Sequence, residues 1–416
     1  MDSHHHWHTG DDTRRMRRVA LSVIVPAGLV TLVALIWLWP SGADAVEESG
    51  RADQFRGVVV DVENVPCPEP PGTSGQDQSA AEGTDNGTDN GCGTAWVRLS
   101  EGADKDKEVQ VALPNGPGAP SVEESDKVVL ITTPTPDGPT YAIVDHQRSN
   151  GLWLLAIAFV LAVIAFARWR GLSALIGLAV TFVLLLLFVV PAILAGESPL
   201  LVAIVGSAAI MLTVLYLTHG FAFSTSVAVL GTLASLTLTG VLASVSVASL
   251  HLTGFADESS TYLGMVHSVN TEGLLLAGIV IGSLGVLDDV TVTQAATVTE
   301  LARANPDYRF TDLYCAGTRV GRSHIASVIN TIVLAYAGSS LPLLILISAN
   351  DSSLGHVVST QVIAQEIVRS VVATLGLIAA VPITTALAAA TARTTIADAG
   401  TDTKTDAAVR LAPAEQ

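Results

Sequence analysis

The sequence GLLLAGIVIGSLGVLDDVTVTQAATVTELARAN, at Gly273–Asn305, joins more polarity to an apolar segment than any other part of the chain. It starts as a membrane-spanning run, which two adjacent aspartates, Asp288 and Asp289, then interrupt. A Thr-rich, amphipathic continuation follows and contains Glu300 and Arg303 near its end. Charged side chains are rare inside membranes, because each costs roughly 2.5–3.5 kcal/mol at the bilayer centre. We therefore expect this stretch to lie at the structural centre of a multi-pass membrane protein.

The composition of the whole chain is that of an integral membrane protein. Of its 416 residues, 50% are hydrophobic and only 14% are charged, whereas soluble domains have about 25% charged residues. Apolar runs of roughly 20 residues recur, and each is long enough to cross a hydrocarbon core of about 30 Å. Much of the formal net charge of −17 comes from the block 45–148, which holds nineteen acidic and seven basic side chains. Such a block repels nucleic acid, so a nucleic-acid partner is not expected.

The apolar runs predict an all-α polytopic membrane protein with about eight transmembrane helices. The first, at 19–39, is interpreted as an uncleaved signal-anchor helix, and the alternative is cleavage after Ala45. The other seven form a transmembrane domain at 150–390. Their expected positions are near residues 150–167, 172–194, 199–217, 224–249, 271–290, 326–348 and 367–390.

The distribution of Lys and Arg predicts the topology. Four arginines at 14–18 precede the first helix and place the N-terminus in the cytoplasm. Alternation of the spans then puts residues 45–148 outside the cell and the C-terminus inside. The loops expected outside carry no Lys or Arg, and they are 195–198, 250–270 and 349–366. Residues 1–18 and 391–416 are expected to be disordered cytoplasmic tails.

The block 45–148 predicts a small extracytoplasmic β domain after the first helix. Apolar and polar residues alternate with period two in short runs, and turn residues separate these runs. About five strands are expected, which suits a small barrel or sandwich of OB-like size. Cys67 and Cys92 both lie in this block. Because disulfides form outside the cell, we expect these two to pair; the alternative is two unrelated thiols.

Asp288 and Asp289 are expected about 24 Å along the sixth helix from its external end, in the cytoplasmic third of the membrane. Adjacent helical residues point about 100° apart, so the two carboxyl groups cannot share one face. In one interpretation the helix breaks near Gly285, and an aspartate caps a second helix. In the other, the pair forms a cation or proton site at a polar helix end, as in many transporters. The sequence leaves both interpretations open.

Other polar residues are expected at the same depth as the aspartates. His219 follows the fourth span, and His324 and Asn330 lie where the seventh begins. We predict that Asp288 or Asp289 meets these side chains to bind an ion or a substrate. No spacing typical of a metal site occurs, so no metal and no cofactor are expected.

Glu366 and Arg369 lie at the external start of the eighth span with i, i+3 spacing. Residues three apart are neighbours on a helix surface, so we expect a structural ion pair. Elsewhere the chain contains no GxSxG, no Walker A and no HExxH motif. The protein is therefore not expected to be an enzyme.

Three strings carry a family resemblance. They are IGSLGVLDDVTVTQAATVTELARANP (Ile281–Pro306), VGRSHIASVINTIVLAYAGSSLPLLIL (Val320–Leu346) and EIVRSVVATLGLIAAVPITTALAA (Glu366–Ala389). These strings resemble the YibE/YibF-like family of bacterial multi-pass membrane proteins, of the actinobacterial type, and the likeness covers about residues 145–390. One departure is Ser323, where such members tend to carry aspartate. The resemblance implies a multi-pass protein of the bacterial inner membrane and does not name a substrate.

Three functional hypotheses follow. The first is a secondary transporter or permease with a cation- or proton-linked polar site at the cytoplasmic end of the sixth helix. The second is a non-transporting envelope scaffold or sensor whose outer β domain binds a partner. The third is a membrane-embedded enzyme, for which the sequence offers no nucleophile. The expected partners are the lipid bilayer, an unknown small solute or ion, and further copies of this chain.

Overall fold

The chain forms two compact units. The computed structural model describes residues 12–40, 54–65, 92–102, 104–115, 119–135, 138–255, 258–349, 355 and 358–410. The helical unit consists of Met1–Ala43 with Ala167–Gln416, and the β unit consists of Asp44–Phe166.

The β unit is a five-stranded antiparallel sheet. Its strands are β1 (Gln54–Glu63), β2 (Thr94–Leu99), β3 (Glu108–Ala112), β4 (Lys127–Thr135) and β5 (Gly138–His146). They are ordered β3-β2-β1-β4-β5, and a bulge between Val59 and Asp61 bends the long strand β1. The two edge strands, β3 and β5, also contact each other, so the sheet curls into a barrel. This strand order is that of the OB-fold, and the five strands agree with the number that the alternation predicts.

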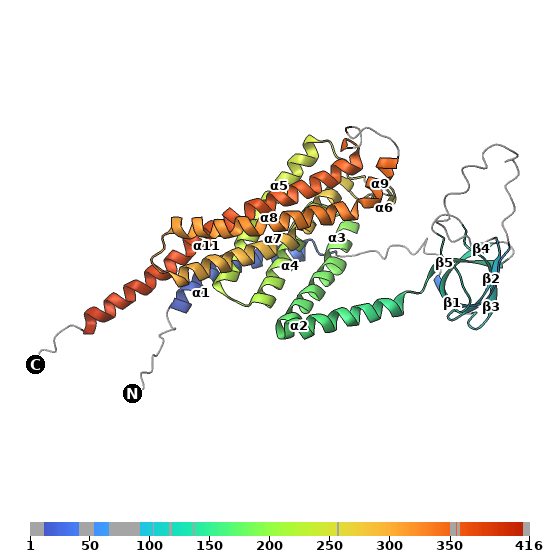
Figure 1. Cartoon of the computed structure of the whole chain (residues 1–416), viewed down its shortest axis with the longest axis horizontal. Helices are drawn as coiled ribbons and strands as arrows, with labels where there is room; N and C mark the ends of the chain where they lie inside the picture. The colour runs from blue at the N-terminus through green and yellow to red at the C-terminus, as the bar shows by residue number, and fades with distance from the viewer. Residues whose placement is uncertain are drawn as a thin grey trace, which may run out of the picture. The chain divides into compact units, whose positions relative to one another are not determined.

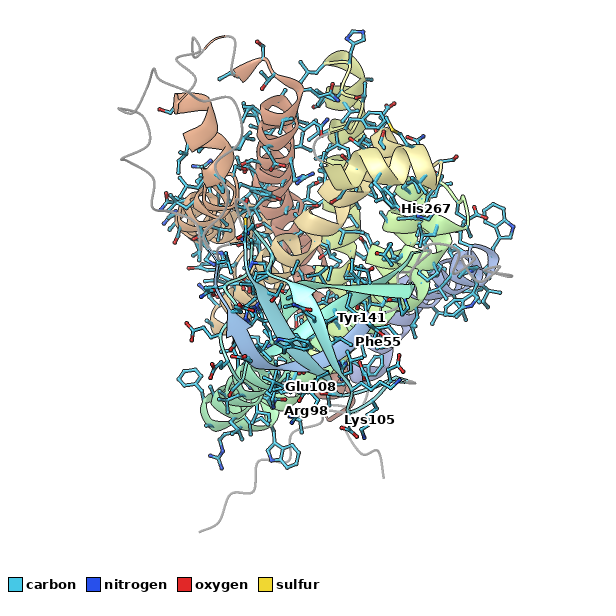
Figure 2. All side chains as sticks on the ribbon, turned by 90° about the vertical axis from the view of Figure 1, so that its right-hand side faces the viewer. Phe55, Arg98, Lys105, Glu108, Tyr141 and His267 are labelled. Atoms are coloured by element: carbon cyan, nitrogen blue, oxygen red, sulfur yellow. The ribbon has the colours of Figure 1, made fainter. Side chains whose placement is uncertain are left out.

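The alternating side chains divide between the inside and the outside of the barrel. The inner face holds a fully buried apolar core that includes Val97, Leu99 and Val128. On the outer face, Arg98 and Glu108 form an exposed ion pair of 2.9 Å, which Figure 2 shows between neighbouring strands. The barrel therefore has its own core, and its polar residues face water.

The helical unit is a bundle built around one long helix, α7 (Thr271–Ala304), which packs against four others. These are α4 (Pro199–His219), α5 (Phe223–Ser249), α8 (Phe310–Ser339) and α11 (Gln361–Arg410), and they run alongside α7 in Figure 1. The remaining elements of this unit are α1 (Asp12–Trp37), the π-helix η1 (Leu185–Val189), α3 (Val190–Leu194), α6 (Glu258–Val266) and α9 (Leu341–Ala349). Helix α2 (Ser149–Leu184) belongs to the β unit up to Phe166 and to the helical unit from Ala167. The stretch that stood out in the sequence is thus the central helix of the bundle.

Two contacts between threonine and glycine bring α5 and α11 close together. Thr384 of α11 lies over Gly231 of α5, and Thr239 of α5 lies over Gly376 of α11. A methyl group added at either glycine would overlap the facing threonine side chain. Small residues of this kind allow helix backbones to approach closely in membranes.

Five described helical stretches, not eight, are long and apolar enough to cross a membrane. They are Ser149–Leu194, Pro199–His219, Phe223–Ser249, Thr271–Ala304 and Gln361–Ala392. The number of spans predicted from the sequence therefore stays a prediction.

The count of five is lower than eight partly because two of the predicted spans lie in one stretch, Ser149–Leu194. This stretch contains helices that meet at Arg168, whose φ of 53° and ψ of −128° are not helical, and this is where the spans 150–167 and 172–194 were expected to separate. At about 1.5 Å per residue its 46 residues are about twice as long as one crossing needs. The span expected at 326–348 is divided at Ser340 between α8 and α9. Pro342 explains that division, because its ring would clash with the carbonyl group four residues earlier.

The helices also continue into the segments predicted to be disordered tails. α1 begins at Asp12 rather than near residue 19, and α11 continues to Arg410 rather than ending near residue 390. Adding a residue to an existing helix costs far less than starting one, so helical structure propagates outward from a packed span. The helix ends therefore differ from the expected span ends, and the disorder of the two tails stays a prediction.

Candidate functional site

Asp288 lies on the side of α7 that faces α4. Leu284 and Val292, one turn before it and one turn after it, pack in an apolar cluster with Met211 and Leu215 of α4. The Asp288 side chain is half-buried, and its Oδ1 atom is buried without a hydrogen-bond partner. A buried carboxylate oxygen without a donor is costly, and binding a proton or a cation removes that cost.

Asp289 lies on a different face of α7, which is exposed. Gly282, Gly285 and Thr293 share this exposed stripe, as expected for residues spaced by three and four. The divergence of the two adjacent aspartates agrees with the geometry of an unbroken helix. Only Asp288 is thus placed against the packed interior.

The proposed helix break near Gly285 is wrong. α7 is continuous from Thr271 to Ala304, and Asn270, whose side chain accepts a hydrogen bond from the Gly273 N–H, is its N-cap. Four neighbouring helices support α7 along its length, so its glycines do not interrupt it. Neither aspartate therefore caps a second helix.

The structure does not join the other predicted site residues to the aspartates. His219 is exposed at the end of α4, where its Nδ1 lies 2.8 Å from the hydroxyl of the preceding threonine. His324 is half-buried and Asn330 is exposed on α8, and the α8 side chains that pack in the core cluster with α7 are instead apolar. No hydrogen bond or ion pair links these three residues to Asp288 or Asp289.

A buried glutamine that sequence reasoning missed connects three helices. Gln294 of α7 is 4% exposed. Its Nε2 donates to the Gly317 carbonyl of α8 at 2.8 Å and to the Thr385 hydroxyl of α11 at 2.7 Å. A Cβ atom at Gly321 of α8 would lie only 2.8 Å from the glutamine Oε1. Gln294 therefore fixes the packing of α8 and α11 on α7.

A second polar contact lies on the same face of α7 as Gln294. The hydroxyls of Thr232 of α5 and Thr291 of α7 are both fully buried and lie 2.6 Å apart. Thr291 also donates to the Asp288 carbonyl at 3.1 Å, so this contact is continuous with the backbone of the aspartate. The spacing of Leu287, Thr291 and Gln294 in the sequence is the signal that could have revealed this face.

The ion pair of α11 is present. Arg369 Nη1 lies 2.9 Å from Glu366 Oε1, and the two side chains are 30% and 23% exposed. The Nε atom of Arg369 is buried without a hydrogen-bond partner.

The predicted disulfide is only partly within the described residues. Cys92 is disulfide-bonded, and Cys315 is free and exposed. Cys67 lies outside the described residues, so its pairing with Cys92 stays a prediction.

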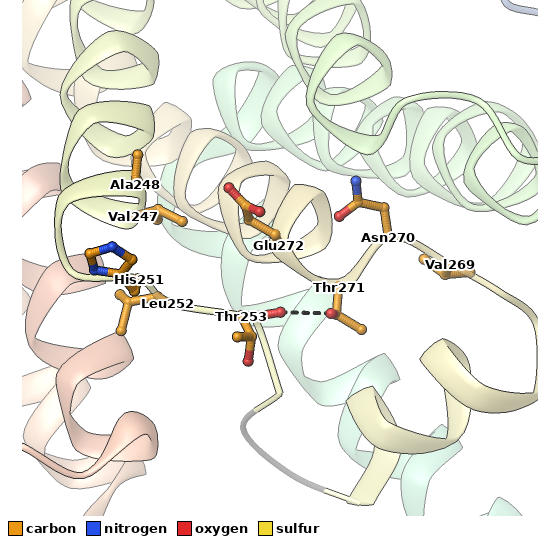
Figure 3. Close-up of a pocket in the computed structure, with 9 residues that line it drawn as sticks. All are labelled: Val247, Ala248, His251, Leu252, Thr253, Val269, Asn270, Thr271 and Glu272. Carbon is orange, nitrogen blue, oxygen red and sulfur yellow. Dashed lines mark hydrogen bonds between the residues drawn. The ribbon is translucent and has the colours of Figure 1, made fainter.

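A pocket of about 500 Å³ lies where α5 ends and α7 begins. Figure 3 shows His251 and Glu272 at its rim, and the hydrogen bond of 2.7 Å from Thr271 Oγ1 to the Thr253 carbonyl. Glu272 is in the first turn of α7, and His251 follows the C-terminal end of α5.

The described residues contain no group of three or more His, Cys, Asp or Glu side chains that could hold a metal ion. The bundle offers carboxyl groups, hydroxyls and the buried amides of Gln294 and Gln365. These groups can bind protons, small cations or polar solutes.

Comparison with known proteins identifies the family. The YibE/F-like protein family matches residues 155–394, a range that includes α4, α5, α7 and α8. The curated proteins and the solved structures gave no significant match. Because the family match covers more than half of the 416 residues, the chain belongs to the YibE/F-like protein family.

Proposed function

We propose that this protein is a proton-coupled secondary transporter in which the Asp288 carboxyl group binds and releases the proton. The observation that carries the proposal is the buried Oδ1 atom of Asp288, which has no hydrogen-bond partner inside the bundle. Ionisable side chains inside membrane helices are costly, and they commonly mark ion or proton routes.

The surroundings of Asp288 support a proton-binding role. Its neighbours on the same face are apolar, so the neutral carboxyl is favoured there unless water or a cation enters. Leu185 of the π-helix η1 packs in the same cluster, and π-helical turns frequently occur at functional sites. A short shift of this turn would change the access of water to the carboxyl group.

The proposed orientation follows from charge. Arg303, Arg309, Arg319 and Arg322 lie around the C-terminal end of α7, which we place in the cytoplasm of a bacterial cell with the bundle in the inner membrane. The pocket at the other end of α7 then opens to the outside. The transported solute is a small molecule or ion.

The test compares two adjacent aspartates that differ in burial. Three proteins are reconstituted in liposomes with a trapped pH-sensitive dye: wild type, Asp288→Asn and Asp289→Asn. Proton flux is measured under an imposed pH gradient, with and without a panel of inorganic cations and amino acids. We expect flux with wild type and Asp289→Asn, and the flux of protein-free liposomes with Asp288→Asn. Equal flux for all three proteins, or none with wild type under every condition, refutes the proposal.

A second candidate function rests on the β unit, which has its own buried core and the strand order of an OB-fold. In this alternative the barrel lies outside the cell and binds a partner, while the helices serve as its membrane platform. Deleting residues 46–148 separates the two functions. A transporter should keep its basal proton flux after the deletion, whereas a scaffold has no such flux to keep.

A further inference from the structure

The pocket where α5 ends and α7 begins is built from segments that hydrogen bonds hold together. Its volume is about 500 Å³. The Thr271 hydroxyl donates to the Thr253 carbonyl at 2.7 Å, which joins the start of α7 to the loop after α5. Gln361 and Gln365 of α11 both donate to the Phe255 carbonyl of that loop, at 3.3 and 3.5 Å. The pocket is therefore formed in advance, and little ordering of the chain is needed to bind a ligand in it.

The lining of the pocket suits a small organic molecule. Apolar side chains form one part of the wall, and they are Val247, Ala248, Leu252 and Val269. Pockets of this volume, with apolar walls and a few polar groups, typically bind small molecules. A bare metal ion fits poorly, because the described residues contain no group of three or more His, Cys, Asp or Glu side chains to coordinate it.

The charge of the pocket comes from Glu272. No lysine or arginine lines the pocket, and residues 250–270, which precede α7, contain neither. The Glu272 side chain is exposed and points toward the end of α5 in Figure 3, where His251 also lies at the rim. A carboxylate in this position attracts a cation and repels an anion.

Two polar side chains define what kind of cation the pocket accepts. The Glu272 carboxylate can accept hydrogen bonds from an ammonium group, and charge-assisted bonds of this kind are strong. The His251 imidazole can accept a further hydrogen bond through a neutral ring nitrogen. An anionic ligand at the start of α7 is disfavoured further, because the Gly273 N–H already donates to the Asn270 side chain.

We propose that this pocket is the external solute site of the transporter, and that its ligand is a small organic amine bound as an ammonium ion. The proposal rests on the proposed function, whose solute it names by class. The Glu272 carboxylate binds the ammonium group, and the organic part of the ligand contacts Val247, Leu252 and Val269. Glu272 and Asp288 are about 24 Å apart along the axis of α7, so the solute and the proton bind at separate places on one helix.

The test measures ligand binding directly and does not depend on proton flux. The full-length protein in detergent micelles is titrated at neutral pH by isothermal titration calorimetry, with protein-free micelles as the blank. The probes are butylamine, ethanolamine, putrescine and tyramine, and butan-1-ol and butyrate serve as the neutral and anionic counterparts of butylamine. We expect saturable binding of at least one amine, and no binding of butan-1-ol or butyrate.

Three variants locate the binding site. Glu272→Gln removes the charge and keeps the size of the side chain, so we expect the Kd of the best amine to rise about tenfold or more, the equivalent of one charge-assisted hydrogen bond. Ala248→Phe should weaken binding as well, because it places a ring in the pocket without changing the charge. The matched control is Glu197→Gln, which removes an exposed carboxylate of the loop before α4 that does not line the pocket, and it should bind like wild type.

The outcomes separate this inference from the proposed function. Glu272 and Ala248 are both exposed, so unchanged melting temperatures are expected for their variants. The inference is refuted if none of the four amines binds, if Glu272→Gln binds them as tightly as wild type, or if butyrate binds more tightly than butylamine. Loss of proton flux in Asp288→Asn without any amine binding refutes the inference alone. Amine binding that depends on Glu272, in a protein without proton flux, supports the site and refutes the transporter.

Discussion

The substitution Gly321→Ala tests whether α7, α8 and α11 meet as closely as the structure shows. An added Cβ atom at Gly321 would lie 2.6 Å from Val381 Cγ1 and 2.8 Å from Gln294 Oε1. Neither neighbour can withdraw easily, because Val381 is 3% exposed and Gln294 is hydrogen-bonded to two other helices. The matched control is Gly285→Ala in the middle of α7, where the new Cβ atom would meet nothing within 4 Å.

The magnitude follows from two opposing contributions. Replacing glycine by alanine inside a helix stabilises by about 0.5–1 kcal/mol through backbone entropy, and both variants share this gain. Overpacking costs typically about 1–3 kcal/mol, and only Gly321→Ala has this cost. We therefore expect Gly285→Ala to be neutral or slightly stabilising, and Gly321→Ala to be less stable than it by about 1–3 kcal/mol.

The assay is the free energy of unfolding in detergent micelles, from denaturant titrations followed by circular dichroism. Both variants are measured beside the wild type under identical conditions. Equal stability of the two variants, or a more stable Gly321→Ala, would contradict the close approach of α8 to Gln294 and Val381.

Three further predictions concern other parts of the chain. Gln294→Leu should lower the free energy of unfolding by about 1–3 kcal/mol, because it removes the amide donor of the buried Thr385 hydroxyl. The same denaturant titrations measure this free energy. An unchanged value would show that the Gln294 amide is not needed for packing. In the barrel, the hydrogen bond from Lys107 holds the pKa of Asp104 below its usual value. This contribution to stability is present above the ordinary aspartate pKa and is lost as the pH falls through the lowered one. Lys107→Ala should raise the Asp104 pKa in an NMR titration, and no change would refute the contact. Reduction of the Cys92 disulfide should destabilise the barrel by about 2–4 kcal/mol, and a melting temperature that is insensitive to reductant would contradict a structural role.

The sequence predicted that one unit is a β domain and the other a bundle of apolar helices, because strands and apolar helices both produce local sequence patterns. Period-two alternation identifies the strands of the barrel, and long apolar runs identify the helices that pack around α7. The prominence of Asp288 and Asp289 also came from the sequence alone. Their divergence on the helix followed from helical geometry, and the structure agrees with it.

Other features depend on how the helices are rotated and could not be read from the sequence. Apolar helices in a membrane lack a clear polar face, so nothing local indicated which side of α8 faces Gln294. The break expected near Gly285 fails for a related reason, since the packing of four neighbouring helices outweighs the helix-weakening effect of glycine. The division at Ser340 had a local signal in Pro342, because proline favours a kink or a helix start.

The threonine-on-glycine contacts between α5 and α11 have a consequence for sequence variation. Each helix contributes one glycine and one threonine, so the two contacts are related by a local two-fold axis between antiparallel helices. A methyl group gained at Gly231 has no room unless Thr384 loses volume, and the same holds for Gly376 and Thr239. Second-site suppressors of a substitution at one of these glycines should therefore map to the threonine that faces it.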